Sequence, residues 1–190
     1  MCRADAAYGF DQSGELLELR TSGELRMADG TLIASFPIDG AVDLPSGVDV
    51  FGRLIAFTVA SGSGGFAVVI GDMDTGEVRE VQRSDRYIGQ ARWSPDGVWL
   101  AMVGPDYRSL WVVSAADGQP VQEITSADPR LSGRFNSPSW IDEDTIAFFD
   151  AVPALVRASR ETGQITVIRI YGAGSDRVPA LPVALSQPPT

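Results

Sequence analysis

A short apolar tetrapeptide recurs along this chain, and it constrains the fold more than any other feature. "WLAM" at 99–102 has near-copies in "LIAF" at 54–57 and "TIAF" at 145–148, and a weaker one in "LLEL" at 16–19. The first residues of the four copies are 38, 45 and 46 positions apart. Such a period is typical of repeat architectures, in which each repeat forms one small supersecondary unit.

A second common element follows each copy of the tetrapeptide. The four segments are "ELRMADGTLIASF" at 24–36, "VVIGDMDTGEVREV" at 68–81, "LWVVSAADGQPVQEI" at 110–124 and "LVRASRETGQITVI" at 155–168. Each is expected to form a hairpin, because Asp-Gly, Thr-Gly and similar pairs between β-prone runs are a strong hairpin signal. Turn-like tetrapeptides precede the copies, at 11–14, 49–52, 94–97 and 141–144. Each repeat therefore holds four short strands.

These repeats predict an all-β fold, a β-propeller with about four blades of four antiparallel strands. No long 3.6-residue periodicity is present, and 20 Gly and 12 Pro punctuate the chain. One blade cannot bury its own faces, so its apolar residues are expected to pack against neighbouring blades. Those expected between the sheets include Trp93, Leu100, Trp111 and Val113. The propeller region is 1–177, with blades at about 5–37, 48–83, 87–126 and 135–170, and 178–190 is a closing strand or a Pro-rich tail.

Four blades leave the closure of the ring open. The chain is a small closed ring, a part of a larger propeller, or one part of an oligomeric ring. An open arc exposes the inner faces and the edges of its first and last sheets, which favours association. Only nine residues precede Phe10, and this abrupt start favours a partial propeller.

The third repeat carries a family resemblance. "WSPDG", "WLAM", "LWVVSAADG" and "VQEIT" within 92–126 closely resemble the WD40-like (PD40) repeat of the TolB family, W-S-P-D-G, then I-A-F, then I-Y-V-M-D with a Gly turn. The fourth repeat (138–170) keeps "PSW", "IAFF" and "TG" but has "IDED" in place of the Pro-containing turn. The second lacks the Trp, and the first is degenerate. About 150 of the 190 residues are covered, and the resemblance indicates a fold more than a function.

The residue types that are missing limit the chemistry. The chain has no His, and all 15 basic residues are Arg, so Ser-His-Asp and Cys-His nucleophiles, Schiff-base and P-loop lysines and His metal sites are excluded. We therefore predict no catalytic residue, no metal site and no cofactor. The formal charge of −10 disfavours nucleic acid. The apolar runs are too short for a transmembrane helix, no signal peptide is recognisable, and Cys2 is the only cysteine.

Two motifs that resemble functional loops are interpreted as turns. In Ser94–Gly97, Pro and Gly have the backbone preferences of a β-turn, and Asp binds nearby amides, so Ser94 is not expected to be a nucleophile. Asp72–Glu77 has alternating carboxylates but lacks the later ligand of a calcium loop, so a solvated hairpin turn is expected. "GSGG" at 62–65 leads into no helix and is expected to be a connector rather than a phosphate loop.

The candidate binding residues lie in the loops that follow the second and fourth strands of each blade, which share one face. They are Arg83, Arg86, Tyr87, Tyr107, Arg108, Arg130 and Arg134. Arg and Tyr combine contact area with directed hydrogen-bond donors, and arginines on an acidic protein point to an anionic group or an acidic peptide. The alternative is a set of solvated or salt-bridged loop arginines.

Two functions remain open at this stage. The first is a non-catalytic propeller scaffold that binds a protein or a small anionic ligand through its loop face, as the resemblance to TolB implies. The second is a propeller domain associated with a prolyl-oligopeptidase-type serine peptidase, or another hydrolase, encoded outside this chain. The same resemblance implies a periplasmic or cell-envelope location, and the lack of Lys is typical of a GC-rich bacterial genome.

Overall fold

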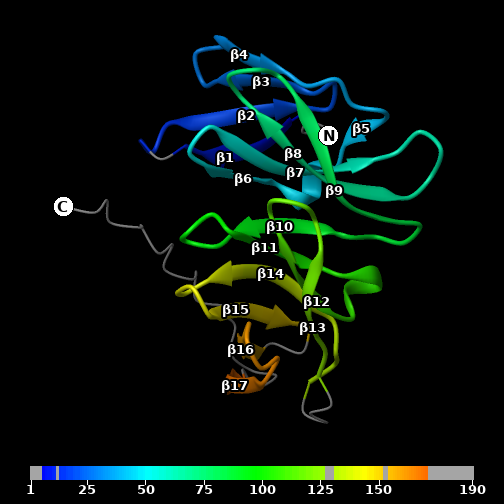
Figure 1. Cartoon of the computed structure of the whole chain (residues 1–190), viewed down its shortest axis with the longest axis vertical. Coiled ribbons are helices and arrows are strands. Elements are labelled where there is room, and N and C mark those ends of the chain that lie inside the picture. The colour runs from blue at the N-terminus through cyan, green and yellow to red at the C-terminus, as the bar shows by residue number, and fades with distance from the viewer. Residues whose placement is uncertain (1–5, 12, 127–130, 152–153, 171–190) are drawn as a thin grey trace.

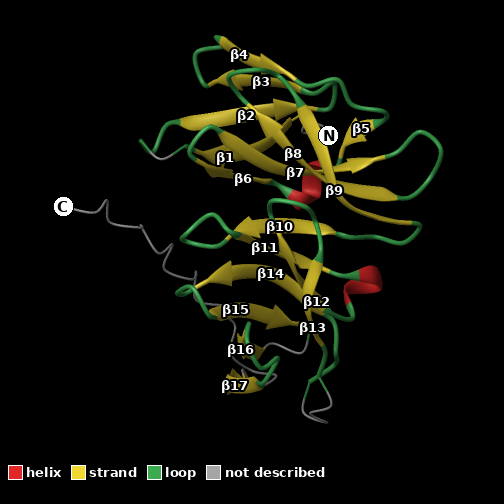
Figure 2. Ribbon diagram, in the orientation of Figure 1, coloured by secondary structure: helices red, strands yellow, loops and turns green. Residues whose placement is uncertain are grey.

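The computed structural model describes residues 6–11, 13–126, 131–151 and 154–170, and both Cys2 and the segment 178–190 lie outside this part. The described residues form four antiparallel sheets (Figures 1 and 2). The only helical turns among them are two short 3-10 helices, η1 (Leu44–Ser46) and η2 (Pro105–Tyr107). No helix of the described chain is long and apolar enough to cross a membrane.

Each sheet follows the chain order from one edge to the other. The first contains β1 (Ala6–Phe10), β2 (Leu16–Arg20), β3 (Glu24–Met27) and β4 (Leu32–Ser35). The second contains β5 (Ala41–Val42), β6 (Val48–Phe51), β7 (Leu54–Ala60), β8 (Phe66–Asp72) and β9 (Val78–Ser84). The third contains β10 (Gly89–Trp93), β11 (Trp99–Val103), β12 (Leu110–Ser114) and β13 (Pro120–Ile124). The fourth contains β14 (Phe135–Trp140), β15 (Thr145–Asp150), β16 (Ala154–Ser159) and β17 (Ile165–Ile170). This arrangement confirms the predicted all-β propeller.

The recurring tetrapeptide is the second long strand of every sheet, in β2, β7, β11 and β15, and the predicted hairpins form the two strands after it. One predicted turn was wrong, because residues 49–51 of "DVFG" belong to β6 and the turn is formed by Gly52 and Arg53. The second sheet also begins earlier than expected. Both β5 and β6 pair with β7, so they are two halves of one inner strand that η1 interrupts.

The turn Ser94–Gly97 is architectural, as predicted. The buried Ser94 hydroxyl donates to Asp96 Oδ1 (2.5 Å) and accepts from the Trp99 amide (2.9 Å). The amide of Gly97 donates to the Ser94 carbonyl (2.9 Å), and Gly97 has a φ of 71°, which favours glycine. In the Asp72–Glu77 turn, Asp72 Oδ1 accepts from the amide of Asp74 (3.0 Å), as expected of a hairpin turn.

The apolar core consists of three clusters among the described residues, and each lies between consecutive sheets. Leu19 and Phe57 belong to the first, Trp93 and Leu100 to the second, and Phe148 to the third. The predicted interior residues Val113 and, partly buried, Trp111 also lie in the second cluster. In Figure 1 the sheets follow one another from top to bottom, with the first and fourth at opposite ends. Among the described residues no core cluster joins the first sheet to the fourth, so the four described sheets form an open arc rather than a closed ring.

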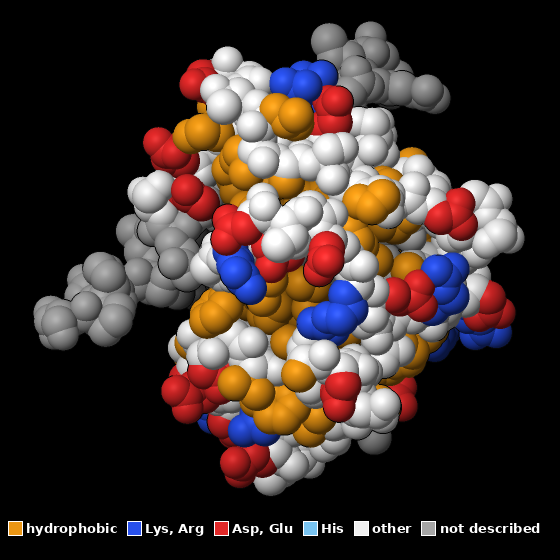
Figure 3. All heavy atoms as spheres, turned by 45° about the horizontal axis from the view of Figure 1, so that its top comes forward, with side chains coloured by type: hydrophobic (Ala, Val, Ile, Leu, Met, Phe, Trp, Pro, Cys, Tyr) orange, Lys and Arg blue, Asp and Glu red, His pale blue; other side chains and the backbone are white. Residues whose placement is uncertain are grey.

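The outer face of the first sheet carries charged and apolar side chains together. Tyr8, Glu18, Arg26 and Leu32 are neighbours across the four strands and share this face. Tyr8 and Leu32 are exposed, while Arg26 pairs with Glu24 (3.2 Å). Figure 3, in which the top of the molecule comes forward, shows acidic and basic side chains mixed among apolar ones. The net charge is not gathered into one patch on the face in view.

Gly97, in a turn of the third sheet, packs against Phe51 of the second sheet, and this contact can be tested. A Cβ on Gly97 would overlap the ring of Phe51 in the second sheet. Gly97→Ala therefore adds a steric clash to the strain of a positive φ, which costs about 1 kcal/mol. We expect Gly97→Ala to lower the free energy of unfolding, measured in urea, by about 2–4 kcal/mol.

The matched control is Gly30→Ala. Gly30 also has a positive φ, of 89°, but nothing lies within 4 Å of a Cβ built there. This variant should lose only the backbone component. Equal losses in the two variants would show that the Phe51 contact contributes nothing.

Candidate functional site

The candidate site lies on the side of the sheets where the longer connections gather. Because adjacent strands are antiparallel, the loops that leave the second and fourth strands of each sheet emerge at the same end. We call this end the loop face. Its described segments are 21–23, 36–40, 61–65, 85–88, 104–109, 125–126 and 131–134, with residue 151.

Two of the predicted residues are in direct contact on this face. The rings of Tyr87, from the connection between β9 and β10, and Tyr107, from η2, are stacked with centroids 4.6 Å apart and an angle of 13°. Phe66 at the start of β8 also contacts Tyr87, with the two ring centroids 5.2 Å apart in a T-shaped arrangement. Residues from two blades therefore form one aromatic cluster.

A hydrogen-bonded chain fixes the hydroxyl of Tyr87. The Ser46 hydroxyl in η1 donates to the carboxylate of Asp43, and Ser46 Oγ lies 2.9 Å from the hydroxyl of Tyr87. Because the single proton of Ser46 is used toward Asp43, Tyr87 is the donor to Ser46. A Cβ on Gly89 would lie 2.6 Å from Ser46 Oγ, so only glycine at this position leaves room for the hydrogen bonds of Ser46. Tyr87 is therefore held by its polar end and presents its ring.

Burial changes the titration of this tyrosine. It raises the pKa of Tyr87 to about 12. The ionised form is disfavoured because a phenolate would lose solvation in this partly buried place. Tyr87 is therefore a neutral structural donor at ordinary pH and a poor general base.

Tyr107 is held in an unusual backbone conformation. Its φ is 63°, in the left-handed region that non-glycine residues seldom adopt. The connection is closed by a hydrogen bond from the amide of Gly104 to the carbonyl of Ser109 (2.8 Å). Strain of this kind costs on the order of 1 kcal/mol, and the ring stacking on Tyr87 compensates for part of it.

Three predicted arginines lie in loops of this face. Arg86 precedes Tyr87 and Arg108 follows Tyr107, and both side chains are exposed. Arg134 is also exposed, in the connection that leads into the fourth sheet. Arg130 lies outside the described residues. Arg86 and Arg108 are thus sequence neighbours of the stacked tyrosines, and they lie on the same face as Arg134.

A buried carboxylate shapes the loop of Arg134. Asp150, at the end of β15, accepts hydrogen bonds from the amides of Ser132 (2.9 Å) and Gly133 (3.0 Å) and from the Ser132 hydroxyl (2.7 Å). The carbonyl of Arg134 accepts from the amide of Ala151 (2.9 Å). The loop is therefore ordered by its backbone, which leaves the Arg134 side chain at the surface.

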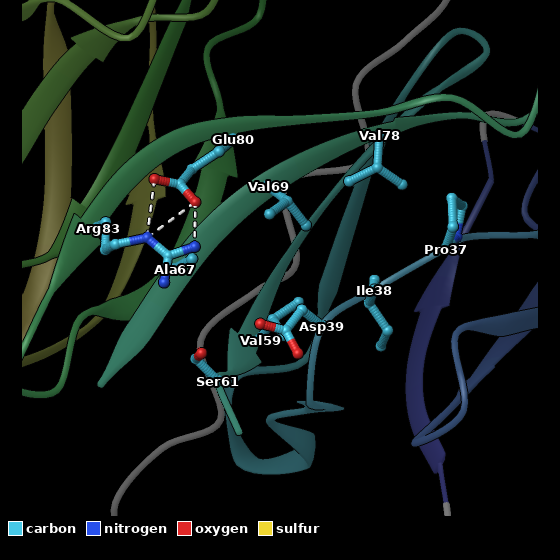
Figure 4. Close-up of a pocket in the computed structure, with 10 residues that line it drawn as sticks. All are labelled: Pro37, Ile38, Asp39, Val59, Ser61, Ala67, Val69, Val78, Glu80 and Arg83. Carbon is cyan, nitrogen blue, oxygen red and sulfur yellow. Dashed lines mark hydrogen bonds and ion pairs between the residues drawn. The ribbon is translucent and has the colours of Figure 1, made fainter. Parts of the chain in front are cut away.

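Arg83 lies apart from the tyrosine pair. Its guanidinium group is held by both carboxylate oxygens of Glu80, with Nε 3.0–3.1 Å from them. Glu80 and, more weakly, Asp39 raise the pKa of Arg83. Figure 4 shows Arg83 and Glu80 at one side of a pocket that is lined by the second sheet and by the connection from the first sheet to it. The predicted loop position of Arg83 was wrong, because the residue lies within β9, but it is salt-bridged as the alternative prediction expected.

Sequence reasoning missed the residues that support the site. Ser46, Phe66 and Asp150 were not singled out because they contact segments that are distant in sequence. Asp43 was also missed, because it acts on Tyr87 only through Ser46. The only signal was "DLPSG" at 43–47, in which Asp before Leu-Pro-Ser can start a helical turn.

The fold resembles those of several solved β-propellers. Oligogalacturonate lyase from Vibrio parahaemolyticus matches with a TM-score of 0.67 and 11% identity, covering 87% of this chain and 53% of the lyase chain. TolB from Acinetobacter baumannii matches with a TM-score of 0.62 and 14% identity, covering 86% and 43%. BamB from Moraxella catarrhalis matches with a TM-score of 0.59 and 17% identity, covering 87% and 48%. At these identities the likeness concerns the fold alone.

The matched region is about half of each of these chains, so this chain corresponds to about half of their length. No family model matches the sequence, and no curated protein does. The class defined by the fold is therefore the β-propeller, as the TolB-like repeats predicted, with no finer family established.

The raised pKa of Tyr87 predicts how stability depends on pH. Because the folded state holds this proton more tightly than the unfolded chain, stability should fall as pH rises from 10 to about 12. The slope approaches about 1.4 kcal/mol per pH unit for one group. Tyr87→Phe should remove this component, which urea unfolding at several pH values would measure. No lysine titrates in this range, since every basic side chain is Arg.

The control is Tyr8→Phe, which removes an exposed hydroxyl from the first sheet. It should keep the slope of the wild type. If Tyr87→Phe also keeps the slope, the Tyr87 hydroxyl is not buried as the structure places it.

Proposed function

We propose that the chain is a non-catalytic β-propeller scaffold that binds a protein or a small anionic ligand through its loop face. The observation that supports this proposal is the stacked pair of Tyr87 and Tyr107, with Arg86 and Arg108 next to them in sequence. Aromatic rings held rigidly lose little entropy on binding, and exposed guanidinium groups supply donors for carboxylates. The stacked rings and the neighbouring guanidinium groups therefore lie together on one face.

The tyrosine pair is prepared before binding. The polar end of Tyr87 is occupied by Ser46, and its ring stacks on that of Tyr107, so both rings are held in place and are partly buried. A partner that covers this pair gains apolar contact without ordering the rings. Arg134 extends the same face toward the fourth sheet.

Three observations support a role without catalysis. The chain has neither His nor Lys to act as a general base. The hydroxyl of Ser94 is used within its turn, and that of Ser46 is used between Asp43 and Tyr87. Tyr87 keeps its proton up to high pH. The hydroxyl groups at these positions act as structural donors and acceptors.

A propeller that serves a peptidase or another hydrolase is the second candidate. One of the similar structures, oligogalacturonate lyase, is an enzyme, so this kind of sheet array does occur in catalysts. An enzyme encoded next to this chain, and co-purifying with it, would favour this candidate. The periplasmic or cell-envelope location also stays a prediction, which cell fractionation would test.

Variants of the loop face test the proposal. Arg108→Ala and Tyr107→Ala should each reduce the amount of partner recovered from a cell extract at least threefold, because they remove an exposed donor and one ring of the stacked pair. Arg86→Ala and Arg134→Ala should weaken recovery without a large change in melting temperature. Quantitative mass spectrometry of the recovered proteins provides the measurement.

Glu143→Gln, in the turn between β14 and β15 at the opposite end of the fourth sheet, is the control and should behave as the wild type. Losses of recovery that track the loss of folded protein across all variants would reject the proposal.

A further inference from the structure

A small pocket lies on the second sheet beside the connection from the first sheet, outside the tyrosine pair (Figure 4). Its volume is about 190 Å³. The floor is aliphatic, and the rim is polar. The floor consists of Val59, Ala67, Val69 and Val78, Ile38 adds apolar surface from one wall, and the rim includes Asp39, Ser61, Glu80 and Arg83. An apolar floor below charged rim groups fits an amphipathic occupant.

One wall of the pocket is the segment Pro37–Asp39, and it is fixed at both ends. On one side the buried ring of Phe36 packs on Phe57, with centroids 5.5 Å apart, and the amide of Phe36 donates to the carbonyl of Gly23 (2.9 Å). On the other side, β5 pairs with the end of β7. The pocket is therefore formed before anything enters it, which lowers the entropic cost of binding.

A β-bulge places the charged rim. In a regular strand, residues three apart point to opposite faces. Glu80 lies opposite Val69 and Arg83 opposite Ala67, because an extra residue between them shifts the register of β9 against β8. Val69 and Ala67 share one face, so both charged side chains lie above the same floor.

The charges of the rim determine whether a positively or a negatively charged group can bind in the pocket. Glu80 holds the guanidinium of Arg83 through two contacts, so Arg83 is already engaged with a carboxylate. Asp39 forms no ion pair with another described residue, and its carboxylate adds a second negative charge against the single positive one. The rim therefore has a net charge of −1, on a chain of net charge −10. An anion would be repelled, and a cation attracted.

We propose that this pocket receives a lysine or arginine side chain of a partner polypeptide. The aliphatic part of the side chain lies on the floor, and its cationic end meets Asp39 and the outer side of Glu80. The volume is below the 300–1,000 Å³ or so typical of sites for drug-sized molecules and suits a single side chain. The pocket thus binds one basic side chain of a partner.

This inference does not depend on the proposed function of the tyrosine pair. The arginines beside that pair favour an anionic group, whereas the pocket favours a cation. Variants of the pocket and variants of the tyrosine pair should therefore affect different ligands, so failure of one proposal can be told from failure of the other.

The test uses the full chain with ¹³C-labelled Ile and Val methyl groups. The methyl signals of Ile38, Val59, Val69 and Val78 are followed by NMR during titration with three probes. The probes are the N-acetyl methylamides of lysine, norleucine and glutamate, which differ in the charge at the end of the chain. Lysine should bind tightest, at millimolar concentration, with an affinity about two- to fivefold above that of norleucine. Added salt should reduce this preference.

Asp39→Asn should abolish most of the preference for lysine over norleucine while leaving norleucine binding unchanged. Glu143→Gln removes a carboxylate far from the pocket and should keep the preference of the wild type. Thermal melting of each variant verifies that it remains folded. Norleucine binding as tightly as lysine, glutamate binding more tightly, no shift at these methyls, or an unchanged preference in Asp39→Asn would each overturn the proposal.

Discussion

Packing of one small sheet on the next is the interaction on which the rest of this structure depends. In β7, Ile55 and Phe57 face the first sheet, while Ala56 faces the third, and all three are buried. A strand covered on both faces has no solvent side, so "LIAFTVA" is nearly continuously apolar rather than alternating. A single sheet of this size exposes two apolar faces, and its stability comes from its neighbours.

The same stacking creates the candidate site. No single repeat contains it, because Ser46 and Phe66 belong to the second blade, Tyr107 to the third, and Tyr87 to the connection between them. The Ser46 and Tyr87 contact spans 41 residues of sequence. The pocket beside Asp39 likewise forms where the connection from the first sheet crosses the second. Ligand sites at junctions between packed units follow from the surface that such units leave concave.

A feature of this structure could be predicted from the sequence when the residues that form it lie close together in the chain. The turn at Ser94–Gly97 was predictable because its hydrogen bonds join residues within five positions. The pairing of Arg83 with Glu80 was not, because it depends on a bulge in β9 that strict alternation does not reveal. The tyrosines were singled out by residue type alone, and their stacking and the support from Asp43 and Ser46 required the fold.

By itself, the sequence determined the four-stranded repeats and their turns, since period, glycine placement and apolar runs act over short distances. It also excluded histidine and lysine chemistry, which composition decides without any fold. Only the tertiary structure decided between a closed ring and an open arc, which charged groups neutralise each other, and which loops meet. Those outcomes depend on the relative placement of whole sheets, and such placement results from the sum of many weak contacts between residues far apart in the chain.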